Sequence, residues 1–133
     1  MVCGKVLIVD DDHDSLAYLS SIVGAAGYAV ETLSDGSDTV ARMRAEPPDM
    51  VFLDIQMPRV NGFQVLRAIR EEEDLAEIPV VFLSAISSVT GEGYDPDKIQ
   101  TQYGVRPDAF MPKTIEPETI RTQLATFVGS RSA

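Results

Sequence analysis

The sequence is poor in cysteine, in basic residues and in long apolar runs. Its 133 residues include a single cysteine, Cys3, no tryptophan, and 11 Lys and Arg against 21 Asp and Glu, for a formal net charge of −10. A lone cysteine cannot form an internal disulfide, which excludes a secreted scaffold held together by disulfides. The negative balance, without any basic patch, argues against direct binding of nucleic acid through its phosphates.

The apolar runs, among them KVLIV, MVFL and PVVFL, are much shorter than the ~20 residues that a membrane helix needs. No signal peptide is indicated, because apolar residues 6–9 lead directly into three aspartates. We therefore expect a cytoplasmic protein that does not insert into membranes. The length suits one domain, since a chain of about 150 residues buries roughly 68–70% of its unfolded surface.

Short β-branched runs alternate with amphipathic stretches along the chain. Asp12 or Asp14 can cap a first helix that Gly27 closes. Further helices are expected up to about Ala45, around the apolar stripe of 65–69, weakly at 97–103, and from about Pro117. The expected strands are 5–9, 28–33, 49–54, 79–83 and 108–111. Five successive βα units predict an α/β fold with a parallel sheet and helices on both faces.

Polar residues follow the ends of these strands, and in such sheets the site lies outside the carboxyl ends. Carboxylates from two neighbouring strand ends repel one another, and a hard cation such as Mg²⁺ can neutralise them while leaving room for phosphate oxygens. A serine hydroxyl and a lysine ammonium can then contact a phosphoryl group, and an aspartate can accept it as the nucleophile. The residues concerned are Asp10, Asp11 and Asp12 after the first strand, Asp54 after the third, Ser84 after the fourth and Lys113 after the fifth.

Four ordered motifs resemble the receiver domain of two-component response regulators. They are VDDD after the first strand, VFLDIQMPRVNG at the third, FLSA at the fourth and a lone lysine after the fifth. The resemblance covers nearly the whole chain and implies a flavodoxin-like (βα)5 fold with strand order 2-1-3-4-5. It also implies a single receiver domain over residues 1–133, and we expect no output domain.

The resemblance implies a phosphorylation-dependent signalling switch rather than a conventional enzyme, although such a domain assists its own phosphorylation and dephosphorylation. A histidine kinase or phosphotransfer protein would phosphorylate Asp54, and the change would alter binding of a downstream protein at the face formed by the fourth helix, fifth strand and fifth helix. Mg²⁺, for which Mn²⁺ can substitute, would be bound by Asp10, Asp11, Asp54 and the backbone carbonyl of Gln56. Ser84 and Lys113 would contact the phosphoryl group, Ser84 and Phe110 would form the switch, and Gln56 and Ile86 would tune hydrolysis.

Two features depart from the family pattern: Thr114 follows the lysine where proline is usual, and the interval from Ser84 to Lys113 is longer than usual. Two other functions stay open at this point. A receiver-like binding module that does not depend on phosphate is one alternative. A small phosphatase of the haloacid dehalogenase type is the other, since Asp10 and Asp12 match the DxD pattern of that family.

Overall fold

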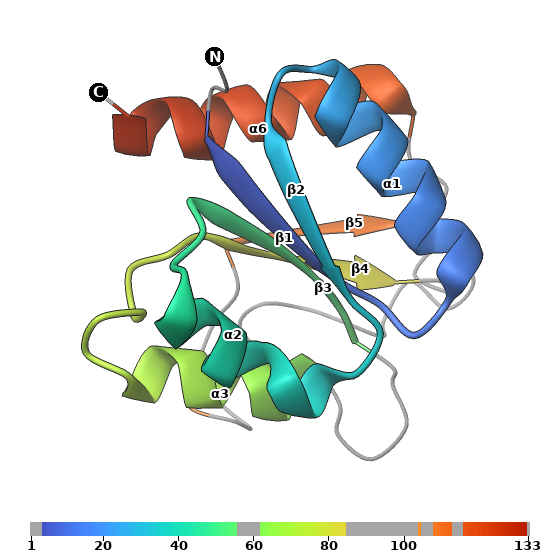
Figure 1. Cartoon of the computed structure of the whole chain (residues 1–133). Helices are drawn as coiled ribbons and strands as arrows, with labels where there is room; N and C mark the ends of the chain where they lie inside the picture. The colour runs from blue at the N-terminus through green and yellow to red at the C-terminus, as the bar shows by residue number, and fades with distance from the viewer. Residues whose placement is uncertain (1–3, 56–61, 85–103, 105–107, 113–115, 133) are drawn as a thin grey trace.

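Five parallel strands form a single sheet in the computed structural model, which describes residues 4–55, 62–84, 104, 108–112 and 116–132. The sheet order is β2-β1-β3-β4-β5, so β3 lies in the middle (Figure 1). This order confirms the expected flavodoxin-like topology. The strands are β1 (Lys5–Val9), β2 (Ala29–Leu33), β3 (Met50–Asp54), β4 (Val80–Ser84) and β5 (Ala109–Pro112).

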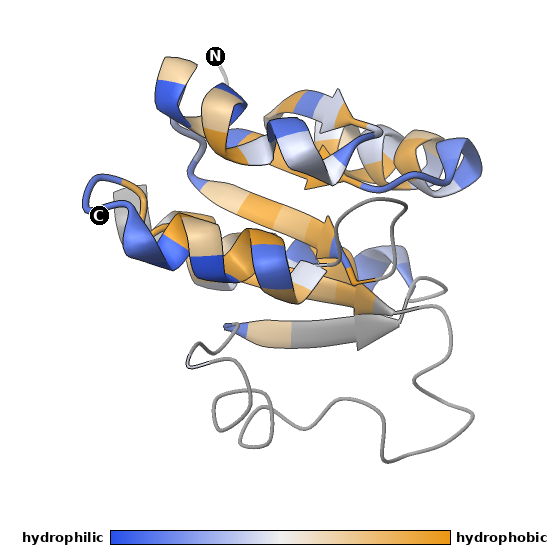
Figure 2. Ribbon diagram, turned by 90° about the horizontal axis from the view of Figure 1, so that it is seen from below, coloured by the Kyte–Doolittle hydropathy of each residue, from blue (hydrophilic) through white to orange (hydrophobic). Residues whose placement is uncertain are grey.

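Helices cover both faces of the sheet (Figure 1). On one face lie α1 (His13–Ala25) and α6 (Pro117–Ser132), and on the other lie α2 (Thr39–Ala45) and α3 (Gly62–Glu71). Figure 2 shows hydrophobic strands between helices that are hydrophobic on one side and hydrophilic on the other. Among the described residues, no helix has the length and apolar character needed to cross a membrane.

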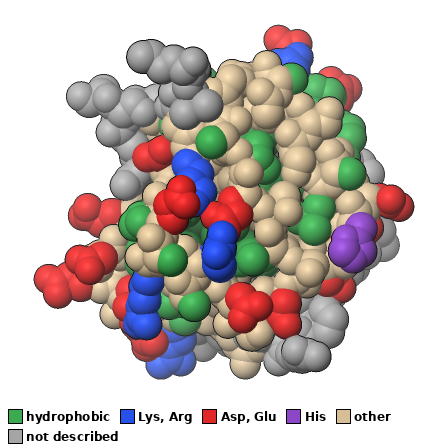
Figure 3. All heavy atoms as spheres, viewed as in Figure 1, with side chains coloured by type: hydrophobic (Ala, Val, Ile, Leu, Met, Phe, Trp, Pro, Cys, Tyr) green, Lys and Arg blue, Asp and Glu red, His purple; other side chains and the backbone are tan. Residues whose placement is uncertain are grey.

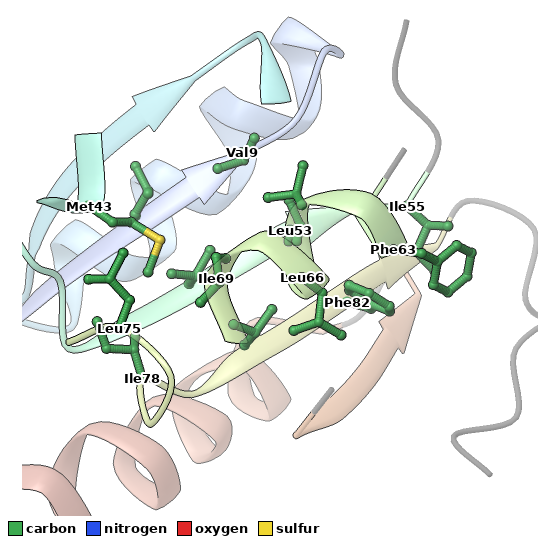
Figure 4. Packing of buried hydrophobic residues seen from close by; sticks show 14 residues of the cluster. Val9, Met43, Leu53, Ile55, Phe63, Leu66, Ile69, Leu75, Ile78 and Phe82 are labelled. Carbon is green, nitrogen blue, oxygen red and sulfur yellow. The ribbon is translucent and has the colours of Figure 1, made fainter. Parts of the chain in front are cut away.

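The two faces of the sheet have separate cores because successive residues of a strand point to opposite sides. In β1, Val6 and Ile8 pack with α1 and α6, whereas Leu7 and Val9 pack with α2 and α3. Figure 4 shows the second of these cores, with apolar side chains filling the space between α3 and the sheet. The central strand β3 is buried along its whole length, so its last residue is held between two packed layers.

The helix boundaries follow the expected signals closely. Asp12 caps α1, since its Oδ1 accepts a hydrogen bond of 3.0 Å from the Asp14 amide, and Gly27 follows the helix with φ of 100°. One difference is the short 3₁₀ helix η1 (Gly36–Asp38), which precedes α2 and begins within the stretch expected as a turn. The Asp35 side chain caps η1 by accepting from the Ser37 amide, which explains why this turn tightens into a helix.

β1 has the expected bounds, whereas the bounds of the other four strands differ by one residue, as at β3, which begins at Met50 instead of Asp49. β2 begins at Ala29 because the Tyr28 amide still bonds to Val23 at the end of α1. β4 begins at Val80, after a proline that has no amide to donate, and extends to Ser84. β5 covers 109–112 instead of 108–111. The weak helix expected at 97–103 lies outside the described residues.

Charged side chains join β1, β2 and α2 on one side of the molecule, where acidic and basic groups alternate in Figure 3. Lys5 Nζ lies 2.8 Å from Glu31 and 3.0 Å from Glu46, and Arg42 also pairs with Glu31. Lys5 and Glu31 are largely shielded from solvent, so the pairing compensates for the loss of their hydration. The network ties the edge strand β2 to the rest of the sheet.

Arg70, in the last turn of α3, ties that helix to the segments that lead into β4 and β5. Its guanidinium donates to the carbonyls of Ala76 and Ile78 at 2.9 and 2.8 Å and to Asp108 Oδ2 at 2.8 Å. The same carboxylate oxygen of Asp108 accepts from the Val80 amide at 2.8 Å. One arginine therefore holds together the end of the sheet opposite to the carboxyl ends of the strands.

Candidate functional site

Three carboxylates meet at the carboxyl ends of the neighbouring strands β1 and β3. One oxygen from each of Asp10, Asp11 and Asp54 lies within 4.8 Å of the other two. Asp10 and Asp54 are 0% and 2% exposed, whereas Asp11 is exposed. The cluster therefore has two buried members and one that reaches solvent.

The β1 side of the cluster is fixed by the transition from strand to helix. The Asp10 amide donates to Leu33 of β2 at 3.0 Å, which continues the sheet pairing just beyond β1. Asp10 Oδ1 accepts from the Asp12 amide at 2.9 Å, and Asp12 in turn caps α1. Asp12 is thus used as a helix cap, and the structure places Asp10 and Asp11, but not Asp12, in the cluster.

The β3 side of the cluster is fixed by the sheet. Asp54 pairs in register with Leu83 of β4, and the Ile55 amide donates to the Leu83 carbonyl at 3.2 Å. The next described residue, Gly62, donates its amide to the Ile55 carbonyl at 2.7 Å and begins α3. Asp54 is therefore anchored through β4 on one side and through the start of α3 on the other.

The electrostatics of the cluster favour a bound cation. Two unit charges 4.8 Å apart repel by about 3.5 kcal/mol at an effective dielectric constant of about 20. Oxygen donors of this kind suit Mg²⁺, which binds one or two carboxylates and keeps several waters. Because Asp11 is exposed, a bound ion would retain access to solvent on that side. The donor set and its mixed burial fit a magnesium ion.

The other residues singled out in the sequence fall at or beyond the edge of the described structure. Ser84 is the last residue of β4 and pairs with Pro112, so its backbone lies at the same edge of the sheet as Asp54. Phe110, within β5, pairs in register with Phe82 of β4. The side chains of Ser84 and Phe110, and all of Gln56, Ile86 and Lys113, lie outside the described residues.

Gly62 is a residue of this site that the sequence reasoning missed. It is buried at the first position of α3, and its backbone approaches that of Asp54 and Ile55. The available signal was the Asn61-Gly62 pair at the end of the loop after Asp54. That pair indicates a turn, but nothing in the sequence alone shows which backbone the glycine will contact.

Comparison with known proteins identifies the family to which this chain belongs. The family model described as response regulator receiver domain matches residues 6–125, so the chain belongs to this family. Protein PilH of Pseudomonas aeruginosa is 33% identical over 118 residues, which cover 87% of this chain and 90% of that protein. The probable transcriptional regulator ycf27 of Guillardia theta is 36% identical over 112 residues, 84% of this chain and 42% of that protein.

Solved structures agree with this assignment. The chemotaxis response regulator CheY4 of Vibrio cholerae superposes with a TM-score of 0.78 at 28% identity, over 92% of this chain and 97% of that one. The signal receiver domain of a histidine kinase from Syntrophus aciditrophicus has a TM-score of 0.79 at 24% identity, over 96% of this chain and 91% of that one, and supports the fold.

Relatives of several lengths carry this domain. The hybrid signal transduction histidine kinase L of Dictyostelium discoideum is 36% identical over 121 residues, which are 89% of this chain but 7% of that protein. The chain thus spans less than half of two of these curated relatives and nearly all of PilH. Receiver domains are signalling domains rather than conventional enzymes, bind Mg²⁺ at an acidic pocket, and interact with histidine kinases or phosphotransfer proteins.

Proposed function

We propose that this receiver domain is a phosphorylation-dependent switch in which Asp54 accepts a phosphoryl group. The observation that carries the proposal is the cluster of Asp10, Asp11 and Asp54, with one oxygen from each within 4.8 Å of the others. Asp54 is the member that ends the central strand, and it is anchored to β4 and to α3. A buried carboxylate held in this way is preorganised for attack, which reduces the entropy lost on reaching the transition state.

In the transfer, a carboxylate oxygen of Asp54 forms a bond to phosphorus. The bond between phosphorus and the donor atom breaks, and its electron pair stays on the donor, either the imidazole of a histidine kinase or phosphotransfer protein or the carboxylate of acetyl phosphate. Asp54 reacts as the carboxylate, so it has no proton to lose. Mg²⁺, or Mn²⁺ in its place, would neutralise the phosphoryl oxygens, with Asp10, Asp11, Asp54 and the Gln56 carbonyl as its protein ligands.

The remaining residues are assigned by family membership. Ser84 and Lys113 contact the phosphoryl group, Gln56 and Ile86 tune its hydrolysis, and Ser84 and Phe110 form the switch. The position of Ser84 at the end of β4, one residue beyond the partner of Asp54, supports its assignment. Phosphorylation adds a charge of about −1.5 to −2 at pH 7, if the phosphoryl group on Asp54 resembles those on other side chains. We expect the change to favour binding of a downstream protein near β5, and we place this signalling in the cytoplasm.

The test is intact-mass measurement after incubation with acetyl phosphate and Mg²⁺. The wild-type protein should gain the mass of one phosphoryl group, and Asp54→Asn should gain none. Asp74→Asn is the matched control, because it makes the same chemical change at an exposed residue beyond α3 and should be labelled like the wild type.

Three outcomes would contradict the proposal. Equal labelling of wild type and Asp54→Asn would move the acceptor to another residue. Absence of label on the wild type, under conditions in which a receiver of known activity is labelled, would favour the phosphate-independent binding module. Hydrolysis of p-nitrophenyl phosphate that requires Asp10 but not Asp54 would instead indicate a phosphatase.

A further inference from the structure

We propose that Gly62 is a positioning residue for the phosphoacceptor. Its lack of a side chain lets the first turn of α3 lie directly against the end of β3, and this contact holds the Asp54 carboxylate in the geometry that the metal requires. The inference rests on the proposed function, because it concerns the same metal and the same acceptor. It adds a residue that contacts neither the metal nor the phosphoryl group and acts through the backbone of Asp54.

The evidence begins with the space around Gly62. A Cβ atom built there would lie 2.7 Å from the Asp54 carbonyl oxygen, 2.9 Å from Ile55 Cα and 3.3 Å from the Asp54 carbonyl carbon. Ordinary van der Waals contact begins at 3.4 Å, so all three distances are too short. The backbone φ of Gly62 lies outside the left-handed region, and the requirement for glycine is therefore steric.

The close approach is held by a hydrogen bond. The Gly62 amide donates to the Ile55 carbonyl at 2.7 Å. This bond joins the first residue of α3 to the residue that directly follows β3. Ile55 and Phe63, which flank the contact, are 2% and 8% exposed and lie at the same end of α3 in Figure 4. The first turn of α3 is thus packed on the acceptor end of the strand.

The neighbours of Gly62 have little freedom to move away. The atoms that a Cβ would meet belong to the backbone, not to the end of a flexible side chain. That backbone belongs to the central strand, which pairs with β1 on one side and β4 on the other. Phe63 also packs edge-to-face on Phe82 of β4, with ring centroids 5.3 Å apart. A side chain at position 62 would therefore displace the Asp54–Ile55 backbone, α3, or both.

Such a displacement matters for the metal because Mg²⁺ demands near-ideal octahedral geometry with ligands at about 2.0–2.1 Å. In the sequence, Ile55 lies between Asp54 and Gln56, the two neighbouring residues proposed as metal ligands, and the Ile55 carbonyl accepts from the Gly62 amide. Outer-shell partners of metal ligands typically change metal affinity by about 10–100-fold when they are mutated. We expect an effect of that size from a displacement of this backbone.

The experiment measures the dissociation constant of Mg²⁺ by isothermal titration calorimetry, without any phosphodonor, for wild type and Gly62→Ala. Thermal unfolding in EDTA is recorded for the same proteins. We expect Gly62→Ala to raise the dissociation constant at least about tenfold, as for other outer-shell changes. Its rate of labelling by acetyl phosphate should fall as well.

Two other glycines provide matched controls. A Cβ at Gly4 would lie 2.8 Å from both Asp49 Oδ2 and Val128 Cγ1, so it would clash with side chains at the opposite end of the sheet, and Asp49 Oδ2 also accepts from the Lys5 amide at 2.9 Å. Gly4→Ala should therefore lower the melting temperature and leave the Mg²⁺ dissociation constant unchanged. At Gly24, within α1, a Cβ would meet no described atom within 4 Å, so Gly24→Ala should change neither metal binding nor labelling and should raise stability slightly.

The outcomes separate this inference from the proposed function. If the wild type binds Mg²⁺ and is labelled, but Gly62→Ala binds Mg²⁺ as tightly as Gly4→Ala does, then Gly62 is a merely structural residue and the inference is wrong. If the wild type itself neither binds Mg²⁺ nor is labelled, the proposed function fails first.

A measurement on the wild type covers the case in which Gly62→Ala does not fold. In a titration of the ¹⁵N-labelled protein with Mg²⁺, the Gly62 amide resonance should shift with the same dissociation constant as the Asp54 amide. The Gly4 and Gly24 amides should stay in place. A Gly62 resonance that does not move while that of Asp54 does would overturn the inference.

Discussion

Replacing Asp54 with asparagine should make the metal-free protein more stable. The buried carboxylates of Asp10 and Asp54 have oxygens within 4.8 Å of each other, which corresponds to a repulsion of about 3.5 kcal/mol at an effective dielectric constant of about 20. Relaxation and water penetration reduce such energies. We therefore expect Asp54→Asn to raise the free energy of unfolding in EDTA by about 2 kcal/mol, or the melting temperature by about 8 °C.

The assay is thermal unfolding followed by circular dichroism, in EDTA and in saturating Mg²⁺. A ligand at about 100 times its dissociation constant stabilises the folded state by about 2.7 kcal/mol. Mg²⁺ should therefore raise the stability of the wild type much more than that of Asp54→Asn, and the difference between the two proteins should close or reverse. Because the pair is buried, moderate salt should screen the repulsion only weakly.

Asp74→Asn again provides the control, since it removes one negative charge from a protein with a net charge of −10 without touching the cluster. If Asp54→Asn is no more stable in EDTA than Asp74→Asn, the cluster is not a source of repulsion. The electrostatic reasoning for a cation at this position would then be refuted.

Two further predictions concern single side chains away from the cluster. The buried Thr39 hydroxyl has no hydrogen-bond partner among the described residues, so Thr39→Val should raise the free energy of unfolding in urea by about 1 kcal/mol. The control, Thr122→Val at an exposed helical position, should be near neutral. A loss of stability in Thr39→Val would contradict this prediction. Arg70→Lys removes the forked contacts to two carbonyls and Asp108 and should lower the free energy of unfolding by about 1.5–3 kcal/mol in the same measurement. The control, Arg67→Lys at an exposed ion pair, should lower it by at most about 0.5 kcal/mol. Equal losses would show that the Arg70 contacts stabilise the protein no more than a surface ion pair does.

Much of the fold was predictable from the sequence because local patterns and tertiary packing agree. The apolar runs of β1 and β3 are buried on both faces, as continuous apolar strands of a parallel sheet should be. Asp12 and Gly27 mark the ends of α1 through local hydrogen bonding and backbone conformation, which depend on few distant residues. The shift at the start of β2 comes from another segment of the same chain, because the Tyr28 amide donates to the Val23 carbonyl of α1.

The sequence predicted the three aspartates of the candidate site, but not the contacts that hold them in place. Aspartates directly after two apolar strands converge because parallel neighbours end at the same edge of the sheet, and the structure brings Asp10, Asp11 and Asp54 together there. The sequence left open whether Asp12 or Asp14 caps the first helix, and it did not show which of Asp10 and Asp11 would be buried. Only the turn into α1 makes Asp12 a helix cap and leaves Asp11 exposed and Asp10 buried beside Asp54.

The order of hydrophobic and polar residues determined by itself that this chain forms alternating strands and helices with acidic groups at the strand ends, because periodicity and capping act over a few residues. Tertiary structure alone decided which distant groups meet. The contact of Gly62 with the Asp54 backbone and the anchoring of β5 by Arg70 join segments whose spacing in the chain says nothing about their distance in space. Such contacts depend on how helices pack across the sheet, which no short stretch of sequence encodes.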